Sequence, residues 1–250
     1  MKNTFIRKIS FVAIFTLFFA TSCEDYLVGL NNNPNSPLEV PVSVLMPAAQ
    51  LNIVDVTGGA FSRFASVIVQ STEGVDRQWT SINDYTSMNP ATYNTAWNNI
   101  YENILVELAL MKADAAELGY GQYEGATNVL MAYTLMMATD VWGDMPYSEA
   151  LLGTDLLSPV FDSQASIYVE INSLLTSGIT LLNGGAGDLA LGSEDLIYGG
   201  DTDLWVRAAN SILARMHLHQ GNYAQALTAA AAGFTSSADN MSFQYPDNAN

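Results

Sequence analysis

The 250-residue sequence is poor in three residue classes that often carry chemistry, with one cysteine, two histidines and eight lysines and arginines. A single cysteine excludes an intrachain disulfide. Eight bases against 25 acids leave a net charge of −17, and the bases are scattered along the chain. Binding to nucleic acid requires a basic footprint that neutralises phosphates. We therefore expect no nucleic-acid partner.

The two histidines are poorly placed to hold a metal ion together. His217 and His219 stand two positions apart in a segment with helical periodicity, so their side chains point to nearly opposite faces of the helix. No further cysteine or histidine is present to complete a zinc ligand set. We expect neither a metal site nor a cofactor.

Long hydrophobic runs are absent downstream of the N-terminus. A basic flank precedes the uncharged run ISFVAIFTLFFA at residues 9–20, which is too short to span a bilayer core of ~30 Å as a helix. A basic flank, a short apolar run and small residues before Cys23 are typical of a secretory signal peptide. We predict a signal peptide at residues 1–22; the alternative is a buried N-terminal helix.

Secretion makes the lone cysteine a candidate attachment point. The stretch A-T-S-C resembles a bacterial lipobox, although Ala20 stands where a larger aliphatic residue is usual. Stable anchoring needs more than one acyl chain, at ~0.8 kcal/mol per buried CH₂, and a multiply acylated Cys23 meets that condition. The alternative is an ordinary signal peptide followed by a free thiol. We predict lipidation at Cys23 and a tether at residues 23–41, where Asn and Pro favour turns.

The chain beyond the signal peptide is strongly acidic. Three of the eight bases precede Cys23 and all 25 acids follow it, so five bases face 25 acids and the net charge is −20. Direct adhesion to an anionic lipid surface is disfavoured by this charge. The composition favours an acidic body attached to the membrane through its lipid.

Apolar residues beyond residue 41 recur mostly with helical spacing. One stripe predicts a helix over about 96–118, with Gly119 as its C-terminal stop. A second stripe, from Tyr123 to Met137, follows a short break, so these helices should form an antiparallel hairpin. A third helix is predicted over about 163–182, with Asp162 or Ser163 as its N-cap.

The clearest hairpin spans residues 203–234. Gly221 should end its first helix, and Asn222 with Gln225 has capping-box spacing for the second. Interleaved aromatic and alanine positions resemble tetratricopeptide units. No convincing β alternation appears, so the predicted fold is all-α, with tetratricopeptide-like hairpins and long loops over residues 42–250. The polar, turn-prone end of the sequence supplies no closing helix, which suggests an incomplete chain.

Enzymatic motifs are not apparent. There is no G-x-S-x-G elbow, and the glycine-rich residues 183–188 lack the spacing and the lysine of a phosphate-binding loop. Asp144, Asp162 and Asp201 each follow or precede a glycine or proline break, where an acid caps a helix or fixes a junction. We interpret these three acids as structural and expect no catalytic residues.

Several stretches, taken in order, resemble one family. C-E-D, N-N-P-N-S-P, W-G-D-M-P-Y-S-E-A, F-D-S-Q-A-S-I-Y, D-L-I-Y-G-G-D and W-V-R-A-A-N-S-I-L-A-R-M are similar to segments of the SusD/RagB family of outer-membrane lipoproteins. The resemblance covers residues 23 to about 234 and corresponds to the N-terminal part of longer family members. It implies a helical fold and a protein that binds a glycan or another nutrient. It also implies a TonB-dependent, SusC-like transporter as partner.

The same resemblance gives roles to the residues around the cysteine. Glu24 and Asp25 are similar to the acidic signal that sends such lipoproteins to the cell exterior. The expected location is therefore the outer membrane, with the protein lipid-anchored and facing outward.

Residues 76–94 offer the groups that sugar recognition needs, namely flat aromatic faces together with amides and charged groups for hydroxyls. This stretch has weak helical periodicity, and loops carry function more often than packed stripes do. The competing interpretation is that its aromatic residues close the core under a long loop. The candidate ligand-binding residues are Asp76, Arg77, Trp79, Asn83, Tyr85 and Tyr93.

Other aromatic residues are expected in the core because they sit on or at the ends of apolar stripes: Trp97, Tyr101, Trp142 and Trp205. The alternative function is a non-catalytic, lipid-anchored helical scaffold that binds another protein. An enzyme remains a third reading, which measurable turnover of a glycan would favour.

Overall fold

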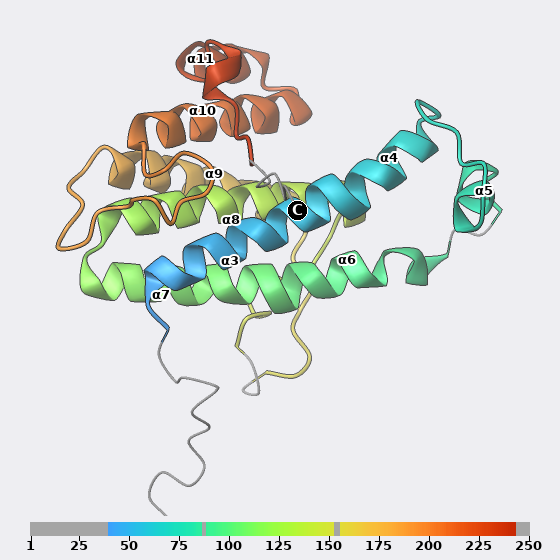
Figure 1. Cartoon of the computed structure of the whole chain (residues 1–250), viewed down its shortest axis with the longest axis horizontal. Helices are drawn as coiled ribbons and strands as arrows, with labels where there is room; N and C mark the ends of the chain where they lie inside the picture. Colours follow the sequence, from blue (N-terminus) through green and yellow to red (C-terminus); the bar gives the residue numbers. More distant parts are fainter. Residues whose placement is uncertain (1–39, 87–88, 153–155, 244–250) are drawn as a thin grey trace, which may run out of the picture. The chain divides into compact units, whose positions relative to one another are not determined.

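The computed structural model describes residues 40–86, 89–152 and 156–243 of the chain (Figure 1). The predicted lipidation site and export signal, residues 23–25, lie outside this part. The chain from Pro41 onward forms one compact unit. Every regular element in the described part of this unit is a helix, so the predicted all-α fold class is confirmed.

Helices follow one another along the whole unit, and the connections between them are mostly short. Three elements are 3-10 or π-helical turns that extend or join α-helices, and a fourth lies near the end of the described chain. In chain order the elements are α3 (Val42–Val54), η1 (Asp55–Phe61), α4 (Ser62–Ile68), α5 (Gln78–Asn83), η2 (Pro90–Tyr93), α6 (Asn94–Asn98), η3 (Asn99–Leu105), α7 (Val106–Leu118), α8 (Gly121–Trp142), α9 (Gln164–Leu182), α10 (Thr202–His219), α11 (Tyr223–Ala232) and η5 (Ser237–Asp239).

Two long helical runs lie side by side at the start of the unit (Figure 1). The first joins α3, the π-helix η1 and α4; the second joins α6, the π-helix η3 and α7. The helix predicted over 96–118 is therefore confirmed, beginning slightly earlier and containing a π-helical turn. The first run was not predicted, although its buried residues Val42, Met46, Ala49 and Ile53 have helical spacing.

The turn between α7 and α8 forms as predicted. Gly119 adopts a left-handed conformation with φ of 72°, which glycine reaches without the steric penalty of a Cβ. Its neighbour Tyr120 donates its backbone N–H to the Ala115 carbonyl at 2.8 Å, which satisfies an end group of α7. The chain then reverses into α8, which packs against α7, so the predicted hairpin is confirmed.

Helices α8 and α9 approach closely where two glycines meet. A Cβ built on Gly178 would lie 3.0 Å from the Gly125 carbonyl oxygen, and one on Gly125 would lie 2.8 Å from Leu182 Cγ. These separations are shorter than ordinary van der Waals contact. The α8–α9 crossing therefore depends on the absence of both side chains.

We expect Gly125→Ala to destabilise the fold by about 1–3 kcal/mol, because overpacking forces backbone shifts of about that cost. Urea unfolding followed by circular dichroism measures the change. Gly58→Ala is the matched control, since a Cβ at Gly58 meets nothing within 4 Å and alanine favours the helix by about 0.8–1.0 kcal/mol over glycine. A Gly125→Ala protein as stable as the unmodified chain would show that the helices can separate freely.

The second predicted hairpin is also present. Helix α10 is capped by Asp201, whose carboxylate accepts the backbone N–H groups of Asp203 and Leu204 at 3.0 and 3.2 Å. Gly221 has a φ of 74° and α11 follows it. The capping box predicted for Asn222 and Gln225 is wrong. Asn222 precedes α11 with a φ of −84° and a ψ of 65°, outside the extended conformation of an N-cap, and its side chain makes no capping hydrogen bond.

The acids at the other junctions have the structural role that their positions indicated. Asp144 accepts the backbone N–H of Gln164 at 2.8 Å. Asp162 accepts the backbone N–H groups of Tyr147 and Ser148 at 2.9 and 2.8 Å. The N-cap of α9 is Ser163 rather than Asp162. These acids fix the two ends of the connection between α8 and α9.

A buried carboxylate that the sequence did not reveal joins three parts of the unit. Asp195 is 2% exposed, and its side chain accepts Gln50 Nε2 and Trp205 Nε1, both at 2.7 Å. It also accepts the backbone N–H of Gly200 at 3.1 Å. A buried carboxylate is tolerated only when it is well hydrogen-bonded, so Asp195 ties α3 and α10 to the loop before α10.

The expected core aromatics fall into two groups. Trp205 is fully buried and meets the Tyr198 ring edge-on at 5.2 Å. Trp97, Tyr101 and Trp142 are only partly buried and pack against the edge of the core. Trp97 lies 4.7 Å from the Tyr101 ring and 5.1 Å from the Trp142 ring. The prediction that these aromatic residues lie in the core is thus confirmed fully for Trp205, whereas the other three lie at the edge of the core.

One helix of the described residues, α9, is long and apolar enough to cross a membrane by length and composition. In this fold it packs against α8 and α10, and its side chains Ile171, Leu174 and Leu175 are buried. Its apolar character therefore serves contacts within the unit.

Candidate ligand-binding site

The segment that carries the predicted ligand-binding residues lies beyond the end of α4 (Figure 1). The sequence suggested one long loop here. Instead, the segment contains the short helix α5 and the 3-10 turn η2. Trp79 and Asn83 lie on α5, and Tyr93 ends η2. Asp76 and Arg77 precede α5 directly, whereas Tyr85 follows it.

An aromatic cluster joins this segment to α4. The Phe64 ring lies 5.6 Å from the Trp79 ring and 5.0 Å from the Tyr93 ring. The Arg63 guanidinium lies 5.9 Å from the centre of the Trp79 ring, within the range of a cation–π interaction. Trp79 remains partly exposed. The cluster therefore holds one indole at the surface beside a positive charge.

A pocket of about 410 Å³ opens beside this indole. Two predicted residues, Asp76 and Trp79, line it together with Arg63 and Glu73 from α4 and the loop after it. The pocket thus combines an aromatic face with two carboxylates and a guanidinium. These are the groups that can stack on a pyranose ring and hydrogen-bond to its hydroxyls.

Gly74 and Asn83 shape the wall of this pocket. The backbone N–H of Gly74 donates to Asn83 Oδ1 at 3.3 Å. A Cβ on Gly74 would lie 2.2 Å from the Trp79 carbonyl oxygen, so only glycine lets the loop approach α5 this closely. Asn83 is therefore a residue that positions the loop.

The remaining predicted residues are less closely tied to the pocket. Arg77 and Asp76 form an ion pair of 3.7 Å whose side chains are 83% and 82% exposed, and such a pair contributes little stability. The Tyr85 hydroxyl donates to the Ile68 carbonyl at 2.5 Å, which fastens the segment to α4. Burial raises the pKa of the Tyr93 hydroxyl, and Tyr93 lines a different cavity.

Two of three non-glycine residues with positive φ lie in the same segment, among the described residues. Among the described residues, the non-glycine positions with positive φ are Gln70, Arg77 and Tyr85, at 56°, 52° and 55°. Such conformations are uncommon for residues with a Cβ. Strained backbone clusters at ligand-binding and switch regions, and this segment carries the candidate ligand-binding residues.

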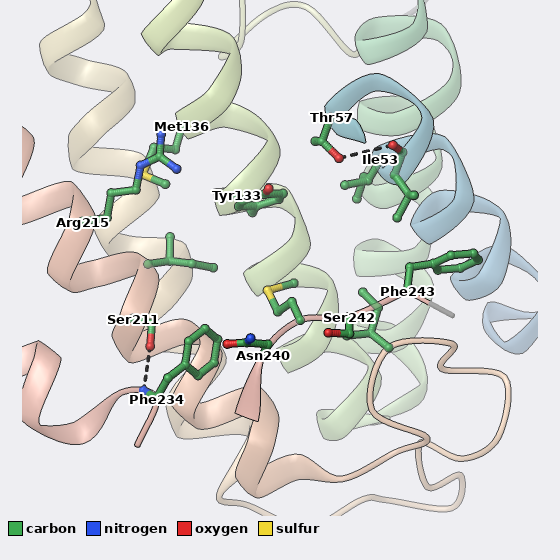
Figure 2. Close-up of a pocket in the computed structure, with 14 residues that line it drawn as sticks. Ile53, Thr57, Tyr133, Met136, Ser211, Arg215, Phe234, Asn240, Ser242 and Phe243 are labelled. Atoms are coloured by element: carbon green, nitrogen blue, oxygen red, sulfur yellow. Dashed lines mark hydrogen bonds between the residues drawn. The ribbon is translucent and has the colours of Figure 1, made fainter. Parts of the chain in front are cut away.

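A second cavity lies between the first helical run and α10. Figure 2 shows Tyr133 of α8 between Arg215 on one side and Ile53 and Thr57 on the other. This cavity of about 460 Å³ adjoins one of about 470 Å³, and the two share Thr57, Tyr133 and Arg215 as lining residues.

A polar group beside these cavities was not predicted. Arg215 lies 3.4 Å from Asp140, whose other oxygen accepts the Tyr168 hydroxyl at 2.7 Å. His219 Nδ1 lies 3.3 Å from Asp140. These residues come from α8, α9 and α10, so no local sequence signal joins them. The group holds the three helices together at the cavity wall.

Among the described residues, no group of three or more His, Cys, Asp or Glu side chains has the arrangement of a metal site. His217 and His219 lie on α10, as expected from their helical segment. One ring nitrogen of His217, Nδ1, is buried without a hydrogen-bond partner in this part of the chain.

The fold is that of a helical-hairpin protein with an aromatic pocket at its surface. The family model for SusD-like proteins, described as starch-binding and associating with the outer membrane, matches residues 34–250. The chain therefore belongs to the SusD-like family, as the sequence resemblance indicated. Among curated proteins no sequence matches.

Solved structures of SusD-like proteins share the fold. A SusD/RagB family protein from Bacteroides thetaiotaomicron is 24% identical with a TM-score of 0.78, over 85% of this chain and 47% of that one. A chitin-binding protein is 24% identical with a TM-score of 0.65, over 80% and 45%. A chitin-binding SusD homolog from Flavobacterium johnsoniae is 18% identical with a TM-score of 0.55, over 74% and 41%. The chain spans about half the length of these proteins.

Proposed function

We propose that this chain is a non-catalytic lipoprotein on the outer face of the outer membrane, which binds a glycan and delivers it to a TonB-dependent, SusC-like transporter. The family description supports association with the outer membrane and binding of starch. The solved relatives include two chitin-binding proteins. A lipid on Cys23 is the proposed anchor, and Glu24 with Asp25 is the proposed export signal.

The observation that carries the binding proposal is the partly exposed Trp79 in its pocket. Asp76, Glu73 and Arg63 line the same pocket, so charged groups stand beside the aromatic face. A sugar ring stacked on the indole would place its equatorial hydroxyls within reach of these groups. The proposed role of Arg77, which pairs with Asp76 and is 83% exposed, is to add a hydrogen bond.

The remaining predicted residues support the pocket without lining it. Asn83 holds the Gly74 loop and Tyr85 holds the segment against α4. Tyr93 packs on Phe64, which in turn packs on Trp79. Their proposed role is to fix the orientation of the indole, since a rigid site loses less entropy on binding.

We expect Trp79→Ala to weaken oligosaccharide binding by at least 10-fold, because stacking area and the aromatic face are lost together. Isothermal titration of the purified chain with chitin and starch oligosaccharides measures this, and it avoids reporting through the deleted fluorophore. Asp76→Ala, which keeps the indole, should also weaken binding. Tyr223→Ala is the matched control, since this tyrosine is 70% exposed on α11 and far from α5 in the chain.

Equal binding by the Trp79→Ala and unmodified chains would overturn the proposed site. A chain that binds none of the oligosaccharides but binds another protein tightly would favour a helical scaffold. Turnover of the oligosaccharide during the titration would favour an enzyme.

A further inference from the structure

The connection between α8 and α9 presents apolar side chains to solvent. Its described residues, 143–152 and 156–163, are called the α8–α9 loop. Within it, Leu152, Leu157, Val160 and Phe161 are 54%, 83%, 54% and 67% exposed. Exposed apolar side chains close together in the chain are candidates for an interaction site, and neither the core nor the Trp79 pocket includes these four residues.

The base of the α8–α9 loop is nevertheless rigidly held. Met145 and Asp162 exchange two backbone hydrogen bonds of 3.1 and 3.0 Å in an isolated antiparallel bridge. The Asp162 side chain also accepts the Ser148 hydroxyl at 2.8 Å. The Tyr101 hydroxyl donates to the Pro146 carbonyl at 2.6 Å. A loop closed at its base in this way loses less ordering entropy on binding than one that is free at both ends.

The charge of the α8–α9 loop indicates what it can meet. Its described residues contain the acids Asp144, Glu149 and Asp162 and no lysine or arginine. Burial opposes ionisation of Asp162, but hydrogen bonds from Ser148 and Tyr147 hold its pKa below the ordinary value, so it is negative at neutral pH. A lipid surface with anionic phosphates would repel this loop. An apolar protein pocket edged by lysine or arginine would complement it.

We propose that the α8–α9 loop docks into such an apolar, basic-edged pocket on the partner protein, with Phe161 as its central anchor. This inference rests on the proposed function, because the partner meant is the outer-membrane transporter. Large aromatic side chains dominate the energetics of protein interfaces. Phe161 directly precedes the Asp162 bridge, so the anchor stands next to the most firmly held point of the loop.

The test is co-isolation of the transporter with the full chain, tagged at its C-terminus and purified from cells in mild detergent. The chain with Leu157→Asp and Phe161→Asp is compared with a control carrying Tyr223→Asp and Leu227→Asp. The control residues are 70% and 74% exposed on α11, so both pairs put two charges at exposed apolar positions. Thermal unfolding of the purified proteins verifies that each variant folds.

We expect the unmodified chain and the α11 control to co-isolate a TonB-dependent β-barrel protein, identified by mass spectrometry. The loop variant should co-isolate at least 10-fold less of this barrel protein, and Phe161→Leu, which stays apolar, should co-isolate nearly as much as the unmodified chain. Retention by the folded loop variant within twofold of the unmodified chain would overturn the docking inference alone. If the unmodified chain isolates no barrel, the proposed function fails as well, so the two failures are distinguishable.

A membrane-binding role gives a different result. The purified Cys23→Ala chain, mixed with phosphatidylcholine vesicles, should remain unbound on flotation. Vesicle binding that Phe161→Asp abolishes would assign the loop to lipid and overturn the inference. A photo-crosslinking residue at position 161, but not at 227, should form an adduct with the barrel.

Discussion

Replacing Trp205 by alanine is expected to lower the free energy of unfolding by about 3–5 kcal/mol, the usual effect of truncating a large buried aromatic. The side chain is 0% exposed. Its loss would leave a cavity between α10 and the loop before it, and would remove the edge-on contact with Tyr198. Asp195 would also lose the indole N–H that lies 2.7 Å from its carboxylate. Urea unfolding of the purified chain, followed by circular dichroism, measures the change.

Two controls separate the contributions. Trp205→Phe keeps most of the apolar volume and removes the indole N–H, so it isolates the hydrogen bond to Asp195, a charge-assisted bond of about 1.5–3 kcal/mol. Trp97→Ala removes an indole that is only partly buried, so a smaller loss is expected. A loss below ~1 kcal/mol for Trp205→Ala would contradict its burial and make it a candidate ligand platform.

The helices were largely predictable because their signals are local. Gly119 and Gly221 mark the ends of α7 and α10 as expected, since both adopt positive φ. The first helical run escaped prediction although Val42, Met46 and Ile53 follow helical spacing. Its π-helix η1 contains Gly58 and Gly59, and a π-turn shifts the apolar periodicity of the residues that follow. The stripe therefore does not continue in register into α4.

The candidate site could be located from the sequence but not assembled from it. Residues 76–94 stood out because they combine aromatic, amide and charged side chains in a short stretch. Arg63 and Phe64, which hold Trp79 in place, precede it by more than a dozen positions and sit on a helix that was not predicted. No sequence pattern predicts a contact between residues so far apart in the chain.

Asp195 illustrates the same limit in the core. In the sequence it is one acid among 25, within a turn-prone stretch. Its partner Gln50 lies 145 positions away. Only the packing of α3 against the loop before α10 turns this acid into a buried acceptor, whereas the exposed Asp144 and the N-cap Asp201 act on neighbours that their junctions already indicate.

Replacement of Cys23 by alanine is expected to block labelling by a fatty-acid probe and to release from the outer-membrane fraction all of the protein that the transporter does not hold. The lipid is the proposed anchor, and the body attached to it carries a net charge of −20, with five bases against 25 acids beyond the signal peptide. Such a body gains nothing from an anionic lipid surface. Two or more acyl chains at ~0.8 kcal/mol per buried CH₂ are sufficient for stable anchoring, so attachment through the lipid should vanish with them. Fractionation after a high-salt wash measures the result.

Replacing Glu24 and Asp25 by alanine is the matched control, because it alters the adjacent residues and keeps the cysteine. This variant should still be lipidated and membrane-bound, but hidden from protease added outside the cell, since the two acids are the proposed export signal. Unchanged protease sensitivity would show that Glu24 and Asp25 are ordinary surface charges with no role in export. A Cys23→Ala protein that stays with the membrane after the salt wash would contradict the lipid anchor. The α8–α9 loop would then be the first place to look for the attachment, because its Leu157 and Phe161 are 83% and 67% exposed.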